Sequence, residues 1–110
     1  MSMNDYEKHD ALGLAELVRR GETTPAELLD AALARIDARN PALNAVVTPL
    51  ADAARREVAA GLPNGPFTGV PFLVKELVAS VAGAATTAAS RLYRSQSATI
   101  SLSAVAIWLR

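Results

Sequence analysis

The chain contains 110 residues, of which 51% are apolar, and it carries 11 basic and 11 acidic residues. This length suffices for one small domain, and the interspersed charges exclude the clustered basic face that nucleic-acid binding requires. The absence of cysteine excludes a disulfide framework, a thiolate metal site and a cysteine nucleophile.

The N-terminal segment is polar and lacks the basic start and apolar core of a signal peptide. Crossing a bilayer takes about 20 predominantly apolar residues. The two least charged stretches, residues 77–90 and 95–109, are shorter than this and are interrupted by serine, threonine or glycine. We therefore expect a cytoplasmic protein without a membrane span.

Residues 11–39 are predicted to form a pair of antiparallel helices joined by a short turn. Asp10 is the expected N-cap of the first helix, and Gly21 ends that helix where a left-handed residue is favoured. Apolar residues recur at helical spacing in both segments and define the expected buried stripes. They are Ala11, Leu14, Leu17 and Val18 in the first helix, and Leu28, Leu29, Ala32, Leu33 and Ile36 in the second.

The second helix has distinct start and stop signals. Thr24 is predicted to be its N-cap, Pro25 occupies the first helical position, and Glu27 completes a capping box. We expect the helix to stop at Asn40, because the residue before a proline, here Pro41, is pushed out of helical geometry.

The remainder, residues 44–93, is predicted as a strand–helix–strand unit of an α/β fold. Residues 44–48 are rich in β-branched side chains, residues 49–60 form a third helix ended by Gly61, and residues 69–75 form the second strand after a loop. That strand is apolar on both faces, which is typical of a covered sheet. Two short strands are too few for a stable sheet, so the missing strands must come from a partner or from further sequence. An unpaired edge would favour self-association.

Beyond the second strand the pattern is weaker. Residues 79–89 are rich in small side chains, which suit either a loop wrapping a site or a weakly specified linker. Residues 94–110 form a divergent apolar tail for which helical spacing is favoured over alternation.

Most catalytic constellations are absent from the sequence. There is no Gly-x-Ser-x-Gly elbow, P-loop, dinucleotide-binding glycine motif or Ser-x-x-Lys. His9 is the only histidine and is interpreted as a surface residue, and the carboxylates are scattered over helix surfaces. We therefore expect neither a metal nor a cofactor.

Lys75 is the one residue whose type and position suggest a catalytic role. It is one of only two lysines and ends the apolar run of residues 69–75. A lysine acts as a general base only when neutral, and burial among apolar neighbours favours that form. Phe72, Leu73, Val74 and Leu77 would supply such surroundings. The alternative is that Lys75 extends from the end of the sheet into solvent, and spacing alone favours this alternative.

The residues around Lys75 resemble a known family. Gly69-Val-Pro-Phe-Leu-Val-Lys-Glu76 is similar to the segment of the amidase signature family that carries its catalytic lysine. Residues 17–28 and 36–47 resemble the N-terminal helices and first strand of that family, and residues 82–93 resemble the loop after the lysine. The likeness covers residues 12–93 in matching order and spacing, which makes it far more specific than one motif.

The resemblance implies a hydrolase that cleaves carbon–nitrogen bonds of small-molecule amides with a Ser–Ser–Lys triad. Lys75 would be the base, drawing a proton through a bridging serine, held by a cis peptide, from the nucleophilic serine. Both serines lie in a later Gly/Ser-rich segment that these 110 residues do not contain. The serines present do not match that segment: Ser80, Ser90, Ser95, Ser97, Ser101 and Ser103.

Some positions depart from the family. Glu76 stands where the family has aspartate, and Ala85 and Ala89 replace a proline and a glycine. The likeness fades after Tyr93, a pattern that a shifted reading frame would produce. We therefore expect residues 1–110 to be a single partial amidase-type domain that is inactive by itself. The alternatives are a non-catalytic remnant or helical interaction module, and a complete small hydrolase with its own serine nucleophile.

Overall fold

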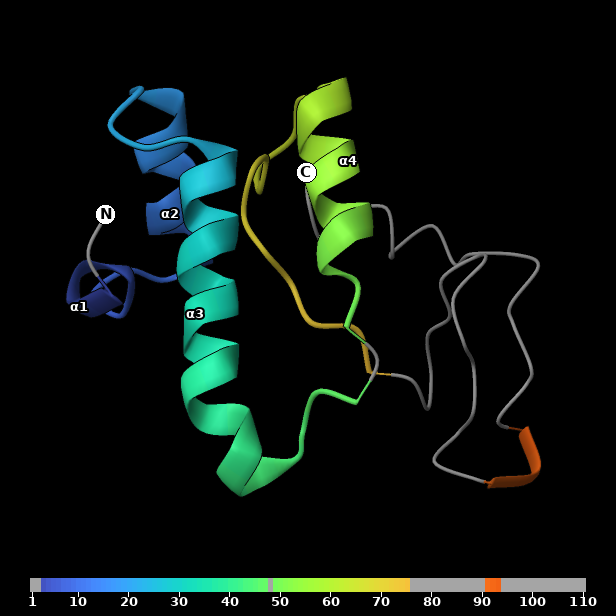
Figure 1. The fold of residues 1–110 in the computed structure, drawn as a ribbon. Coiled ribbons are helices and arrows are strands. Elements are labelled where there is room, and N and C mark those ends of the chain that lie inside the picture. Colours follow the sequence, from blue (N-terminus) through green and yellow to red (C-terminus); the bar gives the residue numbers. More distant parts are fainter. Residues whose placement is uncertain (1–2, 48, 76–90, 94–110) are drawn as a thin grey trace. The chain divides into compact units, whose positions relative to one another are not determined.

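The computed structural model describes residues 3–47, 49–75 and 91–93. These residues fall into two compact units, one reaching to Pro71 and the other beginning at Phe72. The first unit contains four α-helices, and the second contains a short 3-10 helix (Figure 1). The elements are α1 (Met3–Tyr6), α2 (Ala11–Arg19), α3 (Pro25–Leu43), α4 (Ala51–Ala60) and the 3-10 helix η1 (Arg91–Tyr93).

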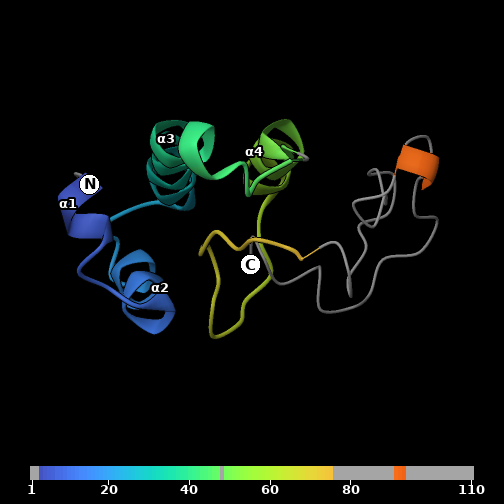
Figure 2. The ribbon, with the colours of Figure 1, turned by 90° about the horizontal axis from the view of Figure 1, so that it is seen from below.

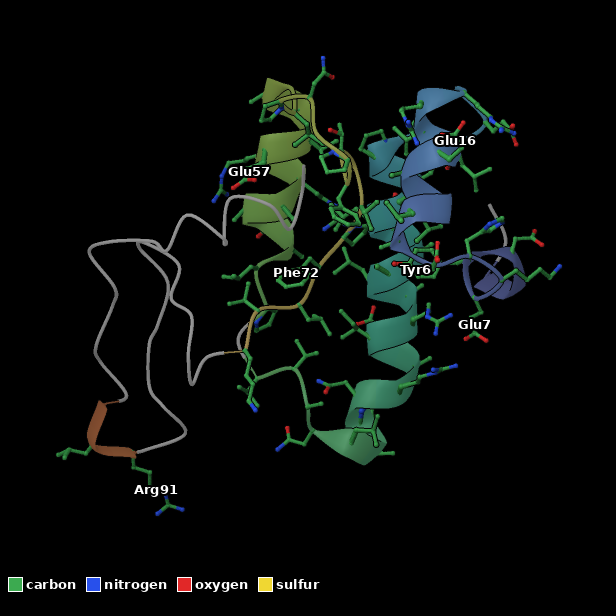
Figure 3. All side chains as sticks on the ribbon, turned by 180° about the vertical axis from the view of Figure 1, so that it is seen from behind. Tyr6, Glu7, Glu16, Glu57, Phe72 and Arg91 are labelled. Atoms are coloured by element: carbon green, nitrogen blue, oxygen red, sulfur yellow. The ribbon has the colours of Figure 1, made fainter. Side chains whose placement is uncertain are left out.

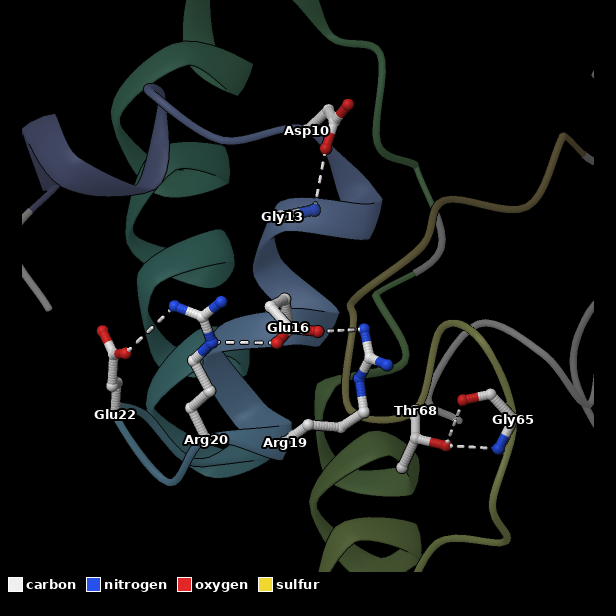
Figure 4. Close-up of polar contacts among 8 residues, drawn as sticks. All are labelled: Asp10, Gly13, Glu16, Arg19, Arg20, Glu22, Gly65 and Thr68. Carbon is white, nitrogen blue, oxygen red and sulfur yellow. Dashed lines mark hydrogen bonds and ion pairs between the residues drawn. The ribbon is translucent and has the colours of Figure 1, made fainter.

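Both ends of α2 form as the sequence predicts. The Asp10 carboxylate accepts a hydrogen bond of 2.8 Å from the backbone N–H of Gly13, which caps the first turn (Figure 4). At the other end, Gly21 has φ +71° and its N–H bonds to the carbonyl of Val18, while the N–H of Glu22 bonds to that of Leu17. These two bonds are a Schellman motif, which satisfies carbonyls that the helix leaves free.

The capping box of α3 is confirmed. The backbone N–H of Glu27 donates to the Thr24 hydroxyl over 3.2 Å, and the Glu27 carboxylate accepts the Thr24 N–H over 2.8 Å. A third donor was not expected: the Thr23 hydroxyl, whose residue is buried, bonds to the same carboxylate over 3.0 Å. Glu27 therefore ties together the turn and the helix start.

This arrangement predicts a pH dependence of stability. Hydrogen bonds from the Thr24 backbone, then from the Thr23 and Thr24 hydroxyls, lower the pKa of Glu27 below its ordinary value of 4.5. Because the folded-state pKa is depressed, the stabilisation is present above about pH 4.5 and is lost as the pH falls through the folded value. In urea unfolding at pH 7 and at pH 3, Glu27→Gln should cost stability at pH 7 and much less at pH 3. Glu57→Gln, at an exposed position on α4, is the control, and an equal cost of Glu27→Gln at both pH values would contradict the prediction.

The predicted end of α3 at Asn40 is wrong, because the helix continues through Pro41 to Leu43. The side-chain amide of Asn40 both donates to the carbonyl and accepts from the N–H of Val46, at 2.9 Å each. Asn44 then ends the helix in a left-handed conformation with φ 48°. The backbone of Val46 therefore bonds to the end of α3 rather than to a neighbouring strand. The predicted strand at 44–48 is wrong for the described residues 44–47, which form no strand.

The core of the first unit lies between α2, α3 and the chain that follows α4. It comprises the buried residues Leu14, Ala15, Leu28 and Val70. Helix α2 runs in one direction and α3 returns, as predicted for the antiparallel pair, while the segment 61–71 lies on the same side of α3 as α2 (Figures 1 and 2). Tyr6, Leu17 and Val18 cover the edge of this core. Leu14 and Leu28 confirm the predicted stripes, whereas Ala11 is exposed.

Helix α4 packs against α3, and its Ala54 is fully buried. Arg55 of α4 forms an ion pair with Asp30 of α3 at 3.1 Å. The helix ends at Gly61 as predicted, with φ +96° there, but it begins at Ala51 after Leu50, without a side-chain cap.

The second predicted strand does not form either: residues 69–75 contain no helix or strand. A strand is held by backbone hydrogen bonds to a neighbouring strand, and among the described residues no segment provides one. The described part of the chain is thus helical, and the sheet of the expected α/β fold is not formed within it.

Candidate functional site

Lys75, the predicted base, lies at the end of the described segment 72–75 and is exposed. Two of its expected apolar neighbours are exposed as well, with 55% of Phe72 and 65% of Leu73 accessible to solvent, and Val74 is only partly buried. Leu77 and Glu76 lie outside the described residues. The described part of the segment therefore does not bury Lys75, and any apolar surroundings must come from other residues.

The chain just before this segment is held firmly in the helical unit. Val70 is only 6% exposed and packs with Leu14, Ala15 and Leu28, and its N–H bonds to the carbonyl of Phe67 over 3.1 Å. Gly69 is buried and has φ +85°, a conformation that favours glycine. A Cβ at Gly69 would lie 2.9 Å from Pro25 Cγ. Val70 is buried although no strand forms, whereas Phe72, which alternation would place on the same face, is exposed.

The loop before Gly69 is organised by the Thr68 hydroxyl. This group accepts the N–H of Gly65 over 2.8 Å and lies 3.0 Å from the carbonyl oxygen of Gly65 (Figure 4). It also lies 3.0 Å from the carbonyl oxygen of Pro63. A single hydroxyl thus closes the turn that leads into the lysine-bearing run. Residues 61–68 were predicted only as a Pro/Gly loop, and this role of Thr68 was missed, although a threonine shortly after Gly-Pro could have indicated it.

A cluster of aromatic and charged side chains joins α1 to α3. The guanidinium of Arg35 lies over the Tyr6 ring, 5.3 Å from its centroid, and Arg35 Nη1 lies 2.5 Å from Glu7 Oε1. Arg39 Nη2 donates to the same Glu7 oxygen over 2.6 Å. Arg35 Nη1 is buried and lies within ion-pair distance of Glu7, but it forms no hydrogen bond. Figure 3 shows Tyr6 lying against α3, and Glu7 beside it.

Burial raises the pKa of the Tyr6 hydroxyl, and the positive charge of Arg35 partly opposes this effect. The tyrosine therefore stays protonated at neutral pH and acts as an anchor. No structure was predicted for this terminus, and the cluster was missed because its partners are far apart in sequence.

The remaining candidates show no site within the described residues. His9 is exposed, as predicted. Among these residues no group of three or more histidine, aspartate or glutamate side chains is placed to hold a metal ion. Within the same part of the chain, no helix is long and apolar enough to cross a bilayer. Ser80, Ser90, Ser95, Ser97, Ser101 and Ser103 lie outside the described residues.

Comparison with known families gives a match over most of the chain. A family model described as Amidase matches residues 27–107. The match includes Lys75 and continues past Tyr93 into the tail, so it gives no support to a change of reading frame there.

Individual relatives agree with this match. The chain is 53% identical over 68 residues to the 6-aminohexanoate-cyclic-dimer hydrolase of Paenarthrobacter ureafaciens, covering 62% of this chain and 13% of that enzyme. It is 43% identical over 86 residues to one of the subunits of the glutamyl-tRNA(Gln) amidotransferase of Alkalilimnicola ehrlichii, covering 72% of this chain and 17% of the relative.

Among solved structures, 6-aminohexanoate cyclic dimer hydrolase complexed with substrate matches with a TM-score of 0.65 and 47% sequence identity. The match covers 72% of this chain and 16% of that enzyme. The chain therefore spans only between 13% and 17% of the length of these relatives.

Proposed function

The chain belongs to the amidase family, and from this membership we propose that it forms the lysine-bearing part of an amide hydrolase. The observation that carries the proposal is the position of Lys75 within the matched residues 27–107, at the end of a segment that resembles the family's catalytic-lysine motif. The helical unit would then be the support from which this segment extends.

In this mechanism Lys75 acts as a neutral amine. It takes a proton from a bridging serine, which takes the proton of the nucleophilic serine as that oxygen attacks the amide carbonyl carbon. The carbon–nitrogen bond breaks, the leaving amine receives the proton, and water then releases the acyl group from the serine. None of the serines in these 110 residues matches either serine of the triad, so both would come from other residues of the complete enzyme.

The exposure of Lys75 is consistent with a site in which this chain contributes the lysine and other residues of the complete enzyme contribute the serines. A lysine becomes a base near neutral pH only in surroundings that disfavour its charge. The described residues leave Lys75, Phe72 and Leu73 exposed. The apolar cover that a neutral lysine needs would therefore be supplied, like the serines, by the rest of the fold.

The first substrate class to test is the cyclic amides. A relative with 53% identity and a solved structure with 47% identity are both hydrolases of a cyclic 6-aminohexanoate dimer. The similarity to one subunit of a glutamyl-tRNA(Gln) amidotransferase makes aminoacyl-transfer-RNA amidation the second reaction to test.

The proposal is tested by placing the matching residues of this chain into the Paenarthrobacter hydrolase, which the 53% identity favours. We expect the chimera to hydrolyse the cyclic dimer, and Lys75→Ala to lower kcat by at least about 100-fold, the scale of general base catalysis. Arg55→Ala, at an exposed position on α4, is the control and should retain activity. The 110-residue chain assayed by itself should show no turnover.

Two results would contradict the proposal. One is a folded, active chimera whose turnover is unaffected by Lys75→Ala, which would remove Lys75 from the mechanism. The other is amide hydrolysis by the 110-residue chain itself that Lys75→Ala abolishes, which would show that the nucleophile lies within these residues.

A further inference from the structure

We propose that Asn64–Gly65 is a site of spontaneous asparagine deamidation, and that the Thr68 hydroxyl slows this reaction while the helical unit is folded. The proposal concerns the chemical lifetime of the loop between α4 and Val70. It does not depend on the proposed amide hydrolysis, and all of its residues lie in the unit that ends at Pro71.

The sequence assigns the reaction to one peptide bond. Deamidation of an asparagine uses the backbone nitrogen of the next residue as the nucleophile, and a following glycine, which has no side chain, leaves the approach open. Asn64 is the only asparagine of the chain that precedes a glycine. Asn40 precedes Pro41, whose nitrogen carries no proton, and Asn44 precedes Ala45.

The loop leaves this bond accessible. Both Asn64 and Gly65 are exposed, and a Cβ at Gly65 would have Thr68 Oγ1 as its nearest contact, at 3.9 Å. Water, the second reactant, can therefore reach the bond in the folded unit.

The reaction needs no reagent other than water. Gly65 N attacks Asn64 Cγ and forms a cyclic succinimide, while its proton passes to the side-chain nitrogen, which leaves as ammonia. Water then opens the ring at either carbonyl carbon and yields aspartate, or isoaspartate with a main chain longer by one carbon. Each event adds one negative charge to a chain whose formal net charge is zero.

The Thr68 hydroxyl opposes the first step because it holds the nucleophile. It accepts the Gly65 N–H over 2.8 Å (Figure 4), and the Thr68 N–H donates to the Gly65 carbonyl over 3.3 Å. The hydroxyl also lies 3.0 Å from the carbonyl oxygen of Pro63, the residue before Asn64. To attack, Gly65 N must give up the proton that it donates to Thr68 and turn towards Asn64 Cγ, so these bonds slow the reaction.

The test follows deamidation of the 110-residue chain at mildly alkaline pH by peptide mapping and mass spectrometry. We expect folded Thr68→Val, which keeps the side-chain shape but lacks the hydroxyl, to deamidate at Asn64 about 2- to 10-fold faster than the parent, the range for loss of one hydrogen bond. Thr68→Ser keeps the hydroxyl and is the matched control, with a rate near that of the parent. Asn44 in the same digests is the internal reference, and Asn64→Gln should remove the added negative charge.

A second measurement requires no variant. Unfolding in urea breaks the bonds to Thr68, so the parent should deamidate at Asn64 faster in urea than in the folded state, and unfolded Thr68→Val should match the unfolded parent. Far-UV circular dichroism establishes which samples are folded. A rate in folded Thr68→Val no greater than that of the folded parent would overturn the proposal, and so would equal rates in the folded and unfolded parent.

Discussion

Replacement of Leu28 by alanine is expected to destabilise the helical unit by about 2–5 kcal/mol, the range for deletion of a fully buried leucine side chain. Leu28 has no exposed surface and packs with Leu14, Ala15 and Val70, so its removal leaves a cavity shared by α2, α3 and the segment after α4. Small domains are stable by only about 5–15 kcal/mol, so the loss is large compared with the whole.

The measurement is urea unfolding followed by far-UV circular dichroism. Leu12→Ala is the matched control, because it makes the same chemical change on α2 where 56% of the side chain is exposed, and it should cost less than about 1 kcal/mol. Equal destabilisation by the two substitutions would show that the core is not centred on Leu28.

Replacement of Arg35 by alanine is expected to cost about 2 kcal/mol, which combines a partly desolvated cation–π contact with loss of the packed side-chain stem. Arg35 is only 20% exposed, lies over the Tyr6 ring and pairs with Glu7. Its removal should also detach α1 from α3, since only the more exposed Arg39 would still hold Glu7.

The matched control is Arg55→Ala, which removes an arginine of α4 that forms an ion pair with Asp30 of α3. Both members of its pair with Asp30 are more than half exposed, and such pairs contribute about 0–1 kcal/mol. Arg35→Lys should restore little, because an ammonium does not reproduce the planar contact with the ring. Urea unfolding measures the costs, and near-ultraviolet signals of Tyr6 report whether α1 is released. A cost of Arg35→Ala no greater than that of Arg55→Ala would contradict this account.

The starts of α2 and α3 and the ends of α2 and α4 could be predicted from the sequence because their signals are local. Asp10 bonds to Gly13, Thr24 to Glu27, and Gly21 and Gly61 adopt positive φ, all within a few residues of where the pattern is read. The failure of the strand predicted at residues 44–48 also has a local cause, since the Asn40 side chain takes the backbone hydrogen bonds of Val46 that a neighbouring strand would have made.

The features that were missed depend on residues far apart in the sequence. The Tyr6–Arg35 contact cannot be read from the composition of either segment, and neither can the close approach of Gly69 to Pro25. The strand prediction for residues 69–75 required a hydrogen-bonding neighbour that the described residues do not contain. Lys75 as a base stays a prediction, because the described residues leave it exposed and do not include the serines.

The place of Val70 in the core has a consequence for the order of events during synthesis. Helices α2 and α3 are adjacent in sequence and are synthesised one after the other. The core between them also contains Val70, which is synthesised much later. Contacts between residues so distant in sequence form slowly, because closing the intervening loop costs conformational entropy. The apolar face of the nascent helices therefore stays exposed until Val70 has been synthesised. The residues that lead to Lys75 are synthesised directly after Val70, the residue that completes this core.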